Sequence, residues 1–204
     1  MNSTTLITLG VIATVLASLL GLVVLPQMQA EAWGPVTVTN AFGGEEQYPP
    51  AYDPLFELPG RQVYISQGCI YCHSQQVAEQ GYRADIDRGW GSRRSVPRDY
   101  VHDRPPLLGT MRTGPDLANV GTRLPSDEWH HVHLFDPRIL SPGSVMPRFG
   151  YLYDVKPQQP EGESYRLPDD YYGYPTWIVP KEDASNLVLY LRRLKQEHAF
   201  EQVR

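Results

Sequence analysis

The sequence predicts a mainly α-helical protein, with one N-terminal transmembrane helix followed by a loop-rich globular domain. An uninterrupted apolar run near the N-terminus is long enough to cross a bilayer. A second apolar pattern, with the helical period, recurs near the C-terminus. Between them, 19 prolines and 17 glycines among 204 residues leave much of the backbone to turns and loops. No alternating run of useful length indicates a strand.

The first element is a predicted membrane anchor in residues 1–30. Its apolar core, Leu6–Leu25, reads LITLGVIATVLASLLGLVVL, and no charged side chain precedes Glu31. A helix of about 20 residues spans roughly 30 Å, the thickness of the hydrocarbon core of a bilayer. A cleaved signal peptide is the alternative. The run is longer than a usual signal core and no basic residue precedes it, so we favour an uncleaved anchor.

Residues 31–57 are a predicted tether between the anchor and a globular domain at residues 58–204. Proline and glycine are frequent in the tether and no helical period is sustained, so extended backbone is expected there. The formal net charge of the chain is -5, which argues against nucleic acid as a partner.

Three helices are predicted within the globular domain. A short one follows Pro59 and leads into residue 69. A second begins after Ser126, a good N-cap residue that is followed by two acidic residues in the first turn. The last and clearest follows Pro180, with Asp183 or Ser185 as the expected cap. Its apolar face is formed by Ala184, Leu187, Val188, Leu191 and Leu194.

The most informative segment reads Cys69-Ile70-Tyr71-Cys72-His73 and contains the only two cysteines of the chain. A C-x-x-C-H order is the attachment signature of a c-type haem, in which each thiol adds to one vinyl group of the porphyrin. The imidazole of His73 is then the proximal iron ligand. We therefore predict one covalent haem c, anchored by Cys69 and Cys72, in a domain of cytochrome c type.

Three other interpretations of the cysteine pair are weaker. A thioredoxin-like redox pair expects a βαβ context, which the flanking sequence lacks. A zinc site needs further ligands, for which only His130, His131 and His133 offer a cluster, and such imidazoles on a helix are more often surface polar residues. A disulfide that closes so short a loop adds little stability.

We expect a methionine as the second axial ligand of the iron. Two of the four methionines lie in the membrane region, which leaves Met111 and Met146. We favour Met146, because Pro147 follows it and fixes the local backbone geometry that holds the thioether. A core-filling role is the alternative for either methionine. Iron held by His73 and Met146 has no open position, so it passes electrons and does not activate small molecules.

Four further residues are candidates to position the haem. The carbonyl of Pro115 can accept the free ring N–H of His73, which would strengthen the donation of the imidazole to the iron. Arg112, Arg123 and Trp129 are candidates to bind the haem propionates, because arginine pairs bidentately with carboxylates. An exposed surface side chain is the alternative for each arginine.

Several segments occur together and in a fixed order: Gly60-Arg61, CIYCHSQ at residues 69–75, Tyr100 with Asp103 and Pro105, RTGPDL at residues 112–117, Trp129-His130, Asp136-Pro137-Arg138 and Met146-Pro147. In this combination the chain resembles the membrane-anchored mono-haem cytochrome c subunit (CcoO/FixO, subunit II) of the C-family, cbb-type haem–copper cytochrome c oxidases. The resemblance runs from the anchor to about residue 155. One departure is the QVAEQ of residues 76–80, where members typically have Met-Ile-Arg-Pro-Phe, and it leaves the subtype open.

The resemblance implies a non-catalytic electron-transfer subunit within an oxidoreductase complex. Its helix would pack against a catalytic haem–copper subunit, and its haem would pass electrons from a dihaem cytochrome or a soluble donor to haem b for the reduction of oxygen to water. It also implies that His73 and Met146 are the axial ligands. Covalent haem c is attached on the outer side of the bacterial inner membrane, so residues 58–204 are expected in the periplasm.

Two alternatives stay open on the sequence alone. One is the equivalent mono-haem subunit of a related nitric oxide reductase, and the other is a free-standing, membrane-tethered electron shuttle. A shuttle needs only a compact domain on a flexible linker. The arginine-rich residues 81–105 and the tyrosine-rich residues 151–174 indicate fixed docking surface instead.

Overall fold

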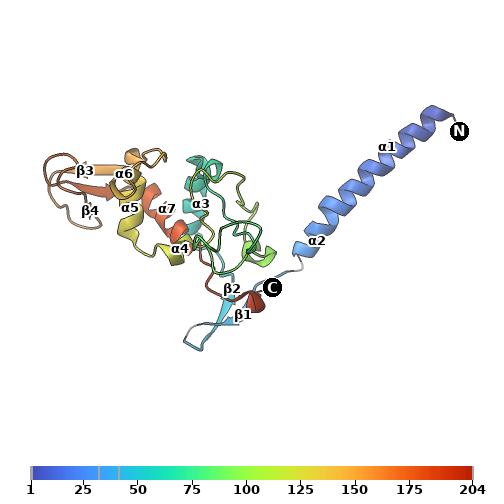
Figure 1. The fold of residues 1–204 in the computed structure, drawn as a ribbon, viewed down its shortest axis with the longest axis horizontal. Helices are drawn as coiled ribbons and strands as arrows, with labels where there is room; N and C mark the ends of the chain where they lie inside the picture. The colour runs from blue at the N-terminus through green and yellow to red at the C-terminus, as the bar shows by residue number, and fades with distance from the viewer. Residues whose placement is uncertain (1, 32, 41, 204) are drawn as a thin grey trace. The chain divides into compact units, whose positions relative to one another are not determined.

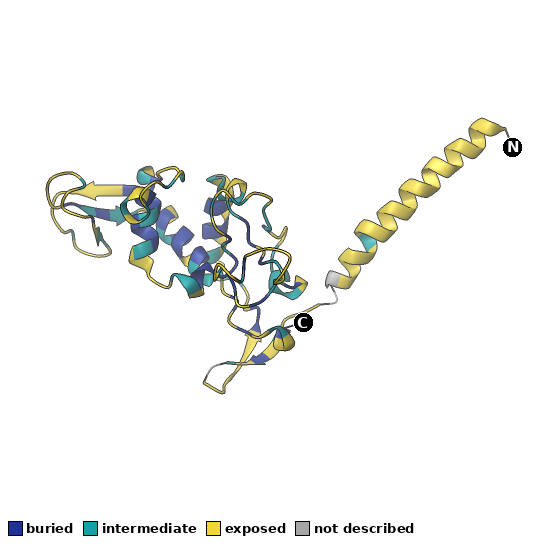
Figure 2. Cartoon of the chain, in the orientation of Figure 1, coloured by how far each residue is buried: buried dark blue, intermediate teal, exposed yellow. Residues whose placement is uncertain are grey.

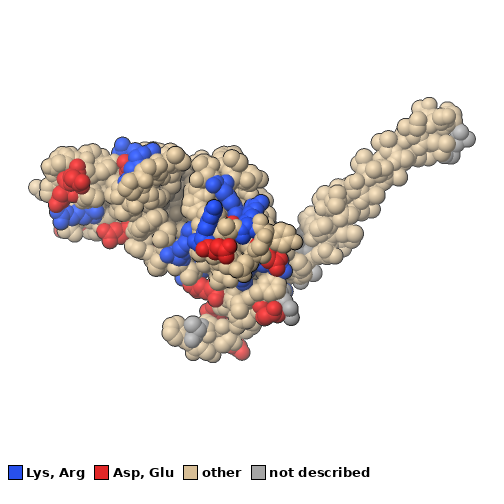
Figure 3. Space-filling view, in the orientation of Figure 1, with Lys and Arg blue, Asp and Glu red and all other residues tan. Residues whose placement is uncertain are grey.

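The N-terminal apolar run forms one long helix in the computed structural model, which describes residues 2–31, 33–40 and 42–203. This helix comprises α1 (Ser3–Leu19), a π-helical turn η1 (Leu20–Val24) and α2 (Leu25–Glu31) (Figure 1). Its residues Ser3–Gln29 are long and apolar enough to cross a membrane, and none of that span is buried. Figure 3 shows the helix without a coloured, charged side chain along its length.

The π-helical turn has a cause in the sequence. Pro26 lacks a backbone N–H, and its ring crowds the carbonyl one turn earlier. A single wider turn ahead of it relieves that crowding, and the N–H of Leu25 accordingly donates to the carbonyl of Leu20, five residues before it.

The described residues divide into two compact units. The smaller unit contains residues 1–50, 96–103 and 201–204, and the larger unit contains residues 51–95 and 104–200. The smaller unit includes a β-hairpin, the 3₁₀ helix η3 (Pro97–Tyr100) and most of the short helix α8 (Phe200–Val203).

The hairpin lies in the segment for which the sequence predicts a semi-extended tether. Its strands β1 (Val36–Thr39) and β2 (Glu45–Tyr48) are antiparallel. Asn40 closes the turn, because its side-chain oxygen accepts from the N–H groups of Phe42 and Gly44 at 3.0 and 2.9 Å. The expectation of no useful strand was therefore wrong here: the Val-Thr-Val-Thr of β1 alternates, but over only four residues.

The larger unit is built around two crossing helices, α3 (Glu57–Ser66) and α7 (Glu182–Arg193) (Figure 1). Gly60 lies at the crossing, where an added Cβ would come within 2.9 Å of Tyr190 Cβ and closer still to the Asn186 carbonyl. Only glycine lets the two backbones approach so closely. The residues that fill this contact are fully or almost fully buried: Val63, Tyr64, Leu187, Val188, Tyr190 and Leu191 (Figure 2).

The remaining elements of the larger unit are short. They are η2 (Cys69–Tyr71), α4 (Val120–Arg123), α5 (Asp127–Phe135), α6 (Pro137–Leu140), η4 (Gly150–Leu152), β3 (Tyr153–Lys156), β4 (Tyr165–Arg166) and β5 (Trp177–Pro180). The three strands form one antiparallel sheet in the order β3–β5–β4. The protein is thus mostly helical, with a long apolar helix and a loop-rich domain that carries small sheets.

The structure confirms the three predicted helices as α3, α5 and α7. Ser126 caps α5 as expected, with its hydroxyl oxygen accepting the N–H of Trp129 at 3.2 Å. The predicted cap of α7 was wrong. Lys181 occupies the N-cap position without a side-chain bond, because the helix begins directly after it and so places Asp183 inside the first turn.

Candidate cofactor site

A cavity of about 590 Å³ opens in the larger unit, within the size range of ligand pockets, roughly 300–1,000 Å³. The two cysteines and His73 line it from η2 and from the residues directly after η2. Met146 lines it from the loop that follows α6. Residues of the 113–115 loop and of α5 complete the wall, so segments far apart in the sequence meet here.

Cys69 and Cys72 are both free thiols. Gly68, with φ of 73°, turns the chain out of α3, and the N–H of His73 donates to the carbonyl of Cys69 at 2.9 Å. Burial raises the pKa of the Cys69 thiol to about 11, so this thiol stays protonated at neutral pH. The tight turn presents both sulfurs and the imidazole to the same cavity.

The ring of His73 is fixed by one backbone acceptor. Its Nδ1–H donates to the carbonyl of Pro115 at 2.8 Å. Burial holds the pKa of His73 below its usual value of 6.5, although the Pro115 carbonyl partly opposes that effect. The imidazole is therefore neutral at neutral pH, and with Nδ1 as the donor its Nε2 keeps a free lone pair for a metal.

Gly114 is a site residue that the sequence analysis did not single out. A Cβ at this position would lie 2.7 Å from Nδ1 and 2.8 Å from Nε2 of His73. No side chain fits there, so glycine is what allows the 113–115 loop to lie against the imidazole. A glycine directly before the predicted acceptor Pro115 was the available signal.

The structure separates the two candidate methionines. Met146 is half-buried, lines the cavity and packs on the hydrophobic core. Its backbone N–H donates to the hydroxyl of Ser144 at 3.3 Å, and Pro147 follows it. Met111 is 54% exposed and is not among the residues that line the cavity.

Arg123 and Trp129 both line the cavity. Arg123 donates from Nη2 to the carbonyl of Asp116 at 3.0 Å, while its Nε is buried without a hydrogen-bond partner. Trp129 stacks on His133, with ring centroids 4.5 Å apart and planes 12° apart. His133 Nδ1 is also buried without a partner and belongs to the same wall.

Arg112 lies elsewhere. It is not among the cavity-lining residues, and its guanidinium is engaged by Asp85, Ser74 and the carbonyl of Gln76. Two acidic side chains, those of Asp85 and Asp116, compete successfully for it. A role in binding propionates does not follow from this placement.

The histidines of α5 have three different environments. His130 Nε2–H donates to the Leu124 carbonyl at 2.9 Å, whereas His131 lies 3.1 Å from the hydroxyl of Tyr153. Burial lowers the pKa of His130, His131 and His133 to about 4 in each case, so all three are neutral at neutral pH. Across the described residues, no group of three or more histidine, cysteine or acidic side chains is arranged to hold a metal ion.

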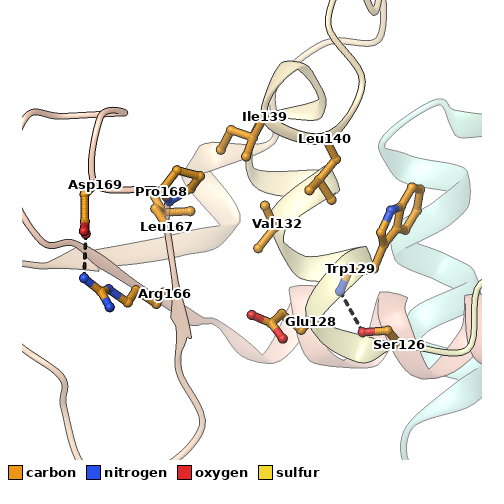
Figure 4. Close-up of a pocket in the computed structure, with 10 residues that line it drawn as sticks. All are labelled: Ser126, Glu128, Trp129, Val132, Ile139, Leu140, Arg166, Leu167, Pro168 and Asp169. Atoms are coloured by element: carbon orange, nitrogen blue, oxygen red, sulfur yellow. Dashed lines mark hydrogen bonds and ion pairs between the residues drawn. The ribbon is translucent and has the colours of Figure 1, made fainter.

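A second pocket, of about 650 Å³, lies beside α5 and shares Trp129 with the first. Figure 4 shows Val132, Ile139 and Leu140 on one side and Leu167 with Pro168 on the other. Its rim carries the ion pair between Arg166 and Asp169, 2.7 Å apart. The pocket offers apolar walls but no cysteine, histidine or methionine, which distinguishes it from the first cavity.

Comparison with models of protein families identifies a family that this chain matches. The model of the family described as "Cytochrome C oxidase, mono-heme subunit/FixO" matches residues 2–165, which is well over half of the chain. No curated protein matches the chain. The matched range includes the apolar helix, both cysteines, His73 and Met146.

Proposed function

We propose, from the premise that this chain belongs to the FixO family of mono-haem cytochrome c oxidase subunits, that its larger unit carries electrons through one haem c in the cavity of residues 69–73. The family makes the chain a subunit of an oxidase complex with a single haem. The attachment residues, the iron ligands and the route of the electron are our proposal.

Observations on the cavity support a haem of the c type at this place. Two thiols with two residues between them and an imidazole with a free Nε2 face one space. The same wall contains two buried polar atoms without partners, Arg123 Nε and His133 Nδ1. Unpaired buried donors are costly, so their presence fits a group that brings acceptors of its own.

Cys69 and Cys72 would hold the porphyrin through thioethers, while His73 and Met146 would ligate the iron. Pro115 orients the imidazole by accepting from Nδ1, and Gly114 leaves room for the ring. When bound, an iron with His and Met ligands supplies one-electron transfer at a raised potential and offers no open position.

Arg123, His133 and Trp129 are the residues that we assign to the polar edge of the haem. The free Nε of Arg123 can donate to a propionate, and neutral His133 can donate from Nδ1. Trp129 stacks on His133 and so fixes its ring. Arg112 is omitted from this set because its guanidinium pairs with Asp85 and Asp116.

The apolar helix Ser3–Gln29 is consistent with a membrane anchor. We propose that it crosses the bacterial inner membrane once and leaves the haem domain, residues 58–204, in the periplasm. The partner that receives the electron would be the catalytic haem–copper subunit, through its haem b, for reduction of oxygen to water. A dihaem cytochrome subunit or a soluble cytochrome c would be the donor.

The proposal that the iron has no open position depends on one observation: Met146 lines the cavity and Met111 does not. A pair of matched variants tests this proposal. In the full-length, haem-loaded chain, Met146→Leu should lower the midpoint potential and let carbon monoxide bind the reduced iron. Met111→Leu removes the same thioether at an exposed position and should do neither. Two results would refute Met146 as the ligand. One is that carbon monoxide binds the reduced wild-type chain, and the other is that it binds neither of the two variants.

A further inference from the structure

A buried charged cluster lies beside the cavity without lining it. It consists of Asp85, Arg112 and Asp116, and the two acidic residues are 1% and 0% exposed. Buried carboxylates are costly unless they are fully hydrogen-bonded and paired. The bonds that satisfy these two therefore indicate what the cluster does.

Asp116 joins two segments that each follow a residue of the site. Its Oδ2 accepts from the hydroxyl of Ser74 at 2.6 Å and from the N–H of Gln76 at 2.8 Å, directly after His73. Its Oδ1 accepts from the N–H of Ala118 at 2.8 Å, shortly after Pro115. One carboxylate thus ties the chain that carries the imidazole to the chain that carries its acceptor.

Arg112 closes the cluster from the other side. Its Nε donates to the Ser74 hydroxyl at 2.9 Å and its Nη2 donates to the Gln76 carbonyl at 2.5 Å. The same guanidinium pairs with Asp85 and lies 3.6 Å from Asp116 Oδ2. Two carboxylates face one guanidinium, so the cluster as a whole retains one negative charge.

Backbone bonds between the same two segments flank the imidazole. The N–H of Gly114 donates to the Cys72 carbonyl at 2.9 Å, and the N–H of Leu117 donates to the Ser74 carbonyl at 2.8 Å. The bond from His73 to Pro115 lies between these two backbone bonds along both segments. Asp116 adds side-chain bonds to Ser74 and Gln76 at one end of this short ladder.

We infer that Asp116 is a positioning residue for His73: it fixes the register in which the Pro115 carbonyl meets the imidazole. The inference rests on the proposed haem ligation by His73. Without the Asp116 carboxylate, a looser register would weaken the bond from His73 Nδ1–H to Pro115, and with it the electron donation of the imidazole to the iron. The loss of this buried negative charge near the imidazole would also disfavour the oxidised iron. Both effects raise the midpoint potential.

The test compares Asp116→Asn with Asp85→Asn in the full-length, haem-loaded chain. Each variant removes one buried carboxylate that pairs with Arg112, but only Asp116 bonds to Ser74 and Gln76. Two readouts report on His73 itself, namely the midpoint potential and the exchange of its Nδ1 proton with water, followed by NMR in the reduced protein. Thermal stability is measured alongside.

Asp116→Asn should raise the potential and speed exchange of the Nδ1 proton roughly tenfold, the factor that corresponds to one hydrogen bond. Asp85→Asn should lower thermal stability but leave proton exchange unchanged. Ser74→Ala keeps the carboxylate and removes one of its bonds, so it should shift both readouts in the same direction by less. If Asp116→Asn fails to fold, Ser74→Ala decides.

Unchanged proton exchange in Asp116→Asn, or in Ser74→Ala where only that variant folds, would overturn the inference. Equal effects of Asp85→Asn and Asp116→Asn on proton exchange would also overturn it. The faster exchange would then follow from the loss of stability that both variants share, and not from the bonds of Asp116 to Ser74 and Gln76. A wild-type chain that takes up no haem would instead refute the proposed function, so the two failures are distinguishable.

Discussion

Gly114→Ala should disturb the site more than its single added methyl group suggests. The new Cβ would lie 2.7 Å from Nδ1 and 2.8 Å from Nε2 of His73, whereas ordinary contacts of a Cβ begin at 3.4 Å. His73 Cε1 would be closer still, so the loop or the ring must move by more than about 0.7 Å. Either movement lengthens the 2.8 Å bond between His73 Nδ1 and the Pro115 carbonyl, because one atom of this bond belongs to the ring and the other to the loop.

The cost of such overpacking is about 1–3 kcal/mol, which lowers the melting temperature of a domain of this size by roughly 2–12 °C. Differential scanning calorimetry of the haem-loaded chain measures this, and a potentiometric titration should show a raised midpoint potential. Gly34→Ala is the control, since a Cβ there meets nothing within 4 Å. Wild-type stability and potential in Gly114→Ala would refute the close contact between the loop and the imidazole.

Three further predictions concern the larger unit. Burial holds the pKa of His131 at about 4, below the ordinary 6.5. Between these two pH values the unfolded chain binds more protons than the folded chain. The free energy of unfolding should therefore fall as the pH drops from about 6.5 to 4, by up to about 3 kcal/mol for this group. His131→Gln should flatten that dependence in denaturant titrations at several pH values, and an unaltered slope would contradict the cause. Gly60→Ala should destabilise the α3–α7 crossing by at least about 1–3 kcal/mol, and a melting temperature equal to that of Gly34→Ala would contradict it. Ser126→Ala should lose the cap of α5 and cost about 1 kcal/mol, whereas Ser126→Asp should retain most of it in the same unfolding assay.

Local chemistry made the site predictable where the sequence itself places the groups together. The segment Cys69–His73 fixes two thiols and an imidazole within one turn, so its spacing alone indicated the cavity wall. The family likeness, now supported by the match over residues 2–165, drew on several such short motifs. Helices α5 and α7 were predictable for a similar reason, because a cap residue or an apolar period is a local property.

Long-range contacts were not predictable in the same way. Arg112 is close to Pro115 in sequence, which made a role at the haem edge plausible, but the fold brings Asp85 to it from 27 residues away. The hydroxyl of Ser74 meets Asp116 across 42 residues. Nothing in composition or period encodes which carboxylate reaches which guanidinium, and this pairing places Arg112 outside the cavity wall.

Short strands were missed for a different reason. The five strands in the described part of the chain are two to four residues long, too short for alternation to stand out from loop sequence. In the hairpin, the decisive feature is Asn40, whose side chain bonds to two N–H groups of the turn. A turn residue of this kind is visible in the sequence but gives no register until both strands are placed.

The central claim is that Cys69 and Cys72 hold one haem covalently, and mass spectrometry of the mature, full-length chain tests it most directly. The account predicts a mass that exceeds the polypeptide by one haem, with both cysteines resistant to alkylation by a thiol reagent under denaturing, reducing conditions. A chain with the mass of the bare polypeptide and two alkylated cysteines, purified from cells that mature other c-type cytochromes, would contradict it.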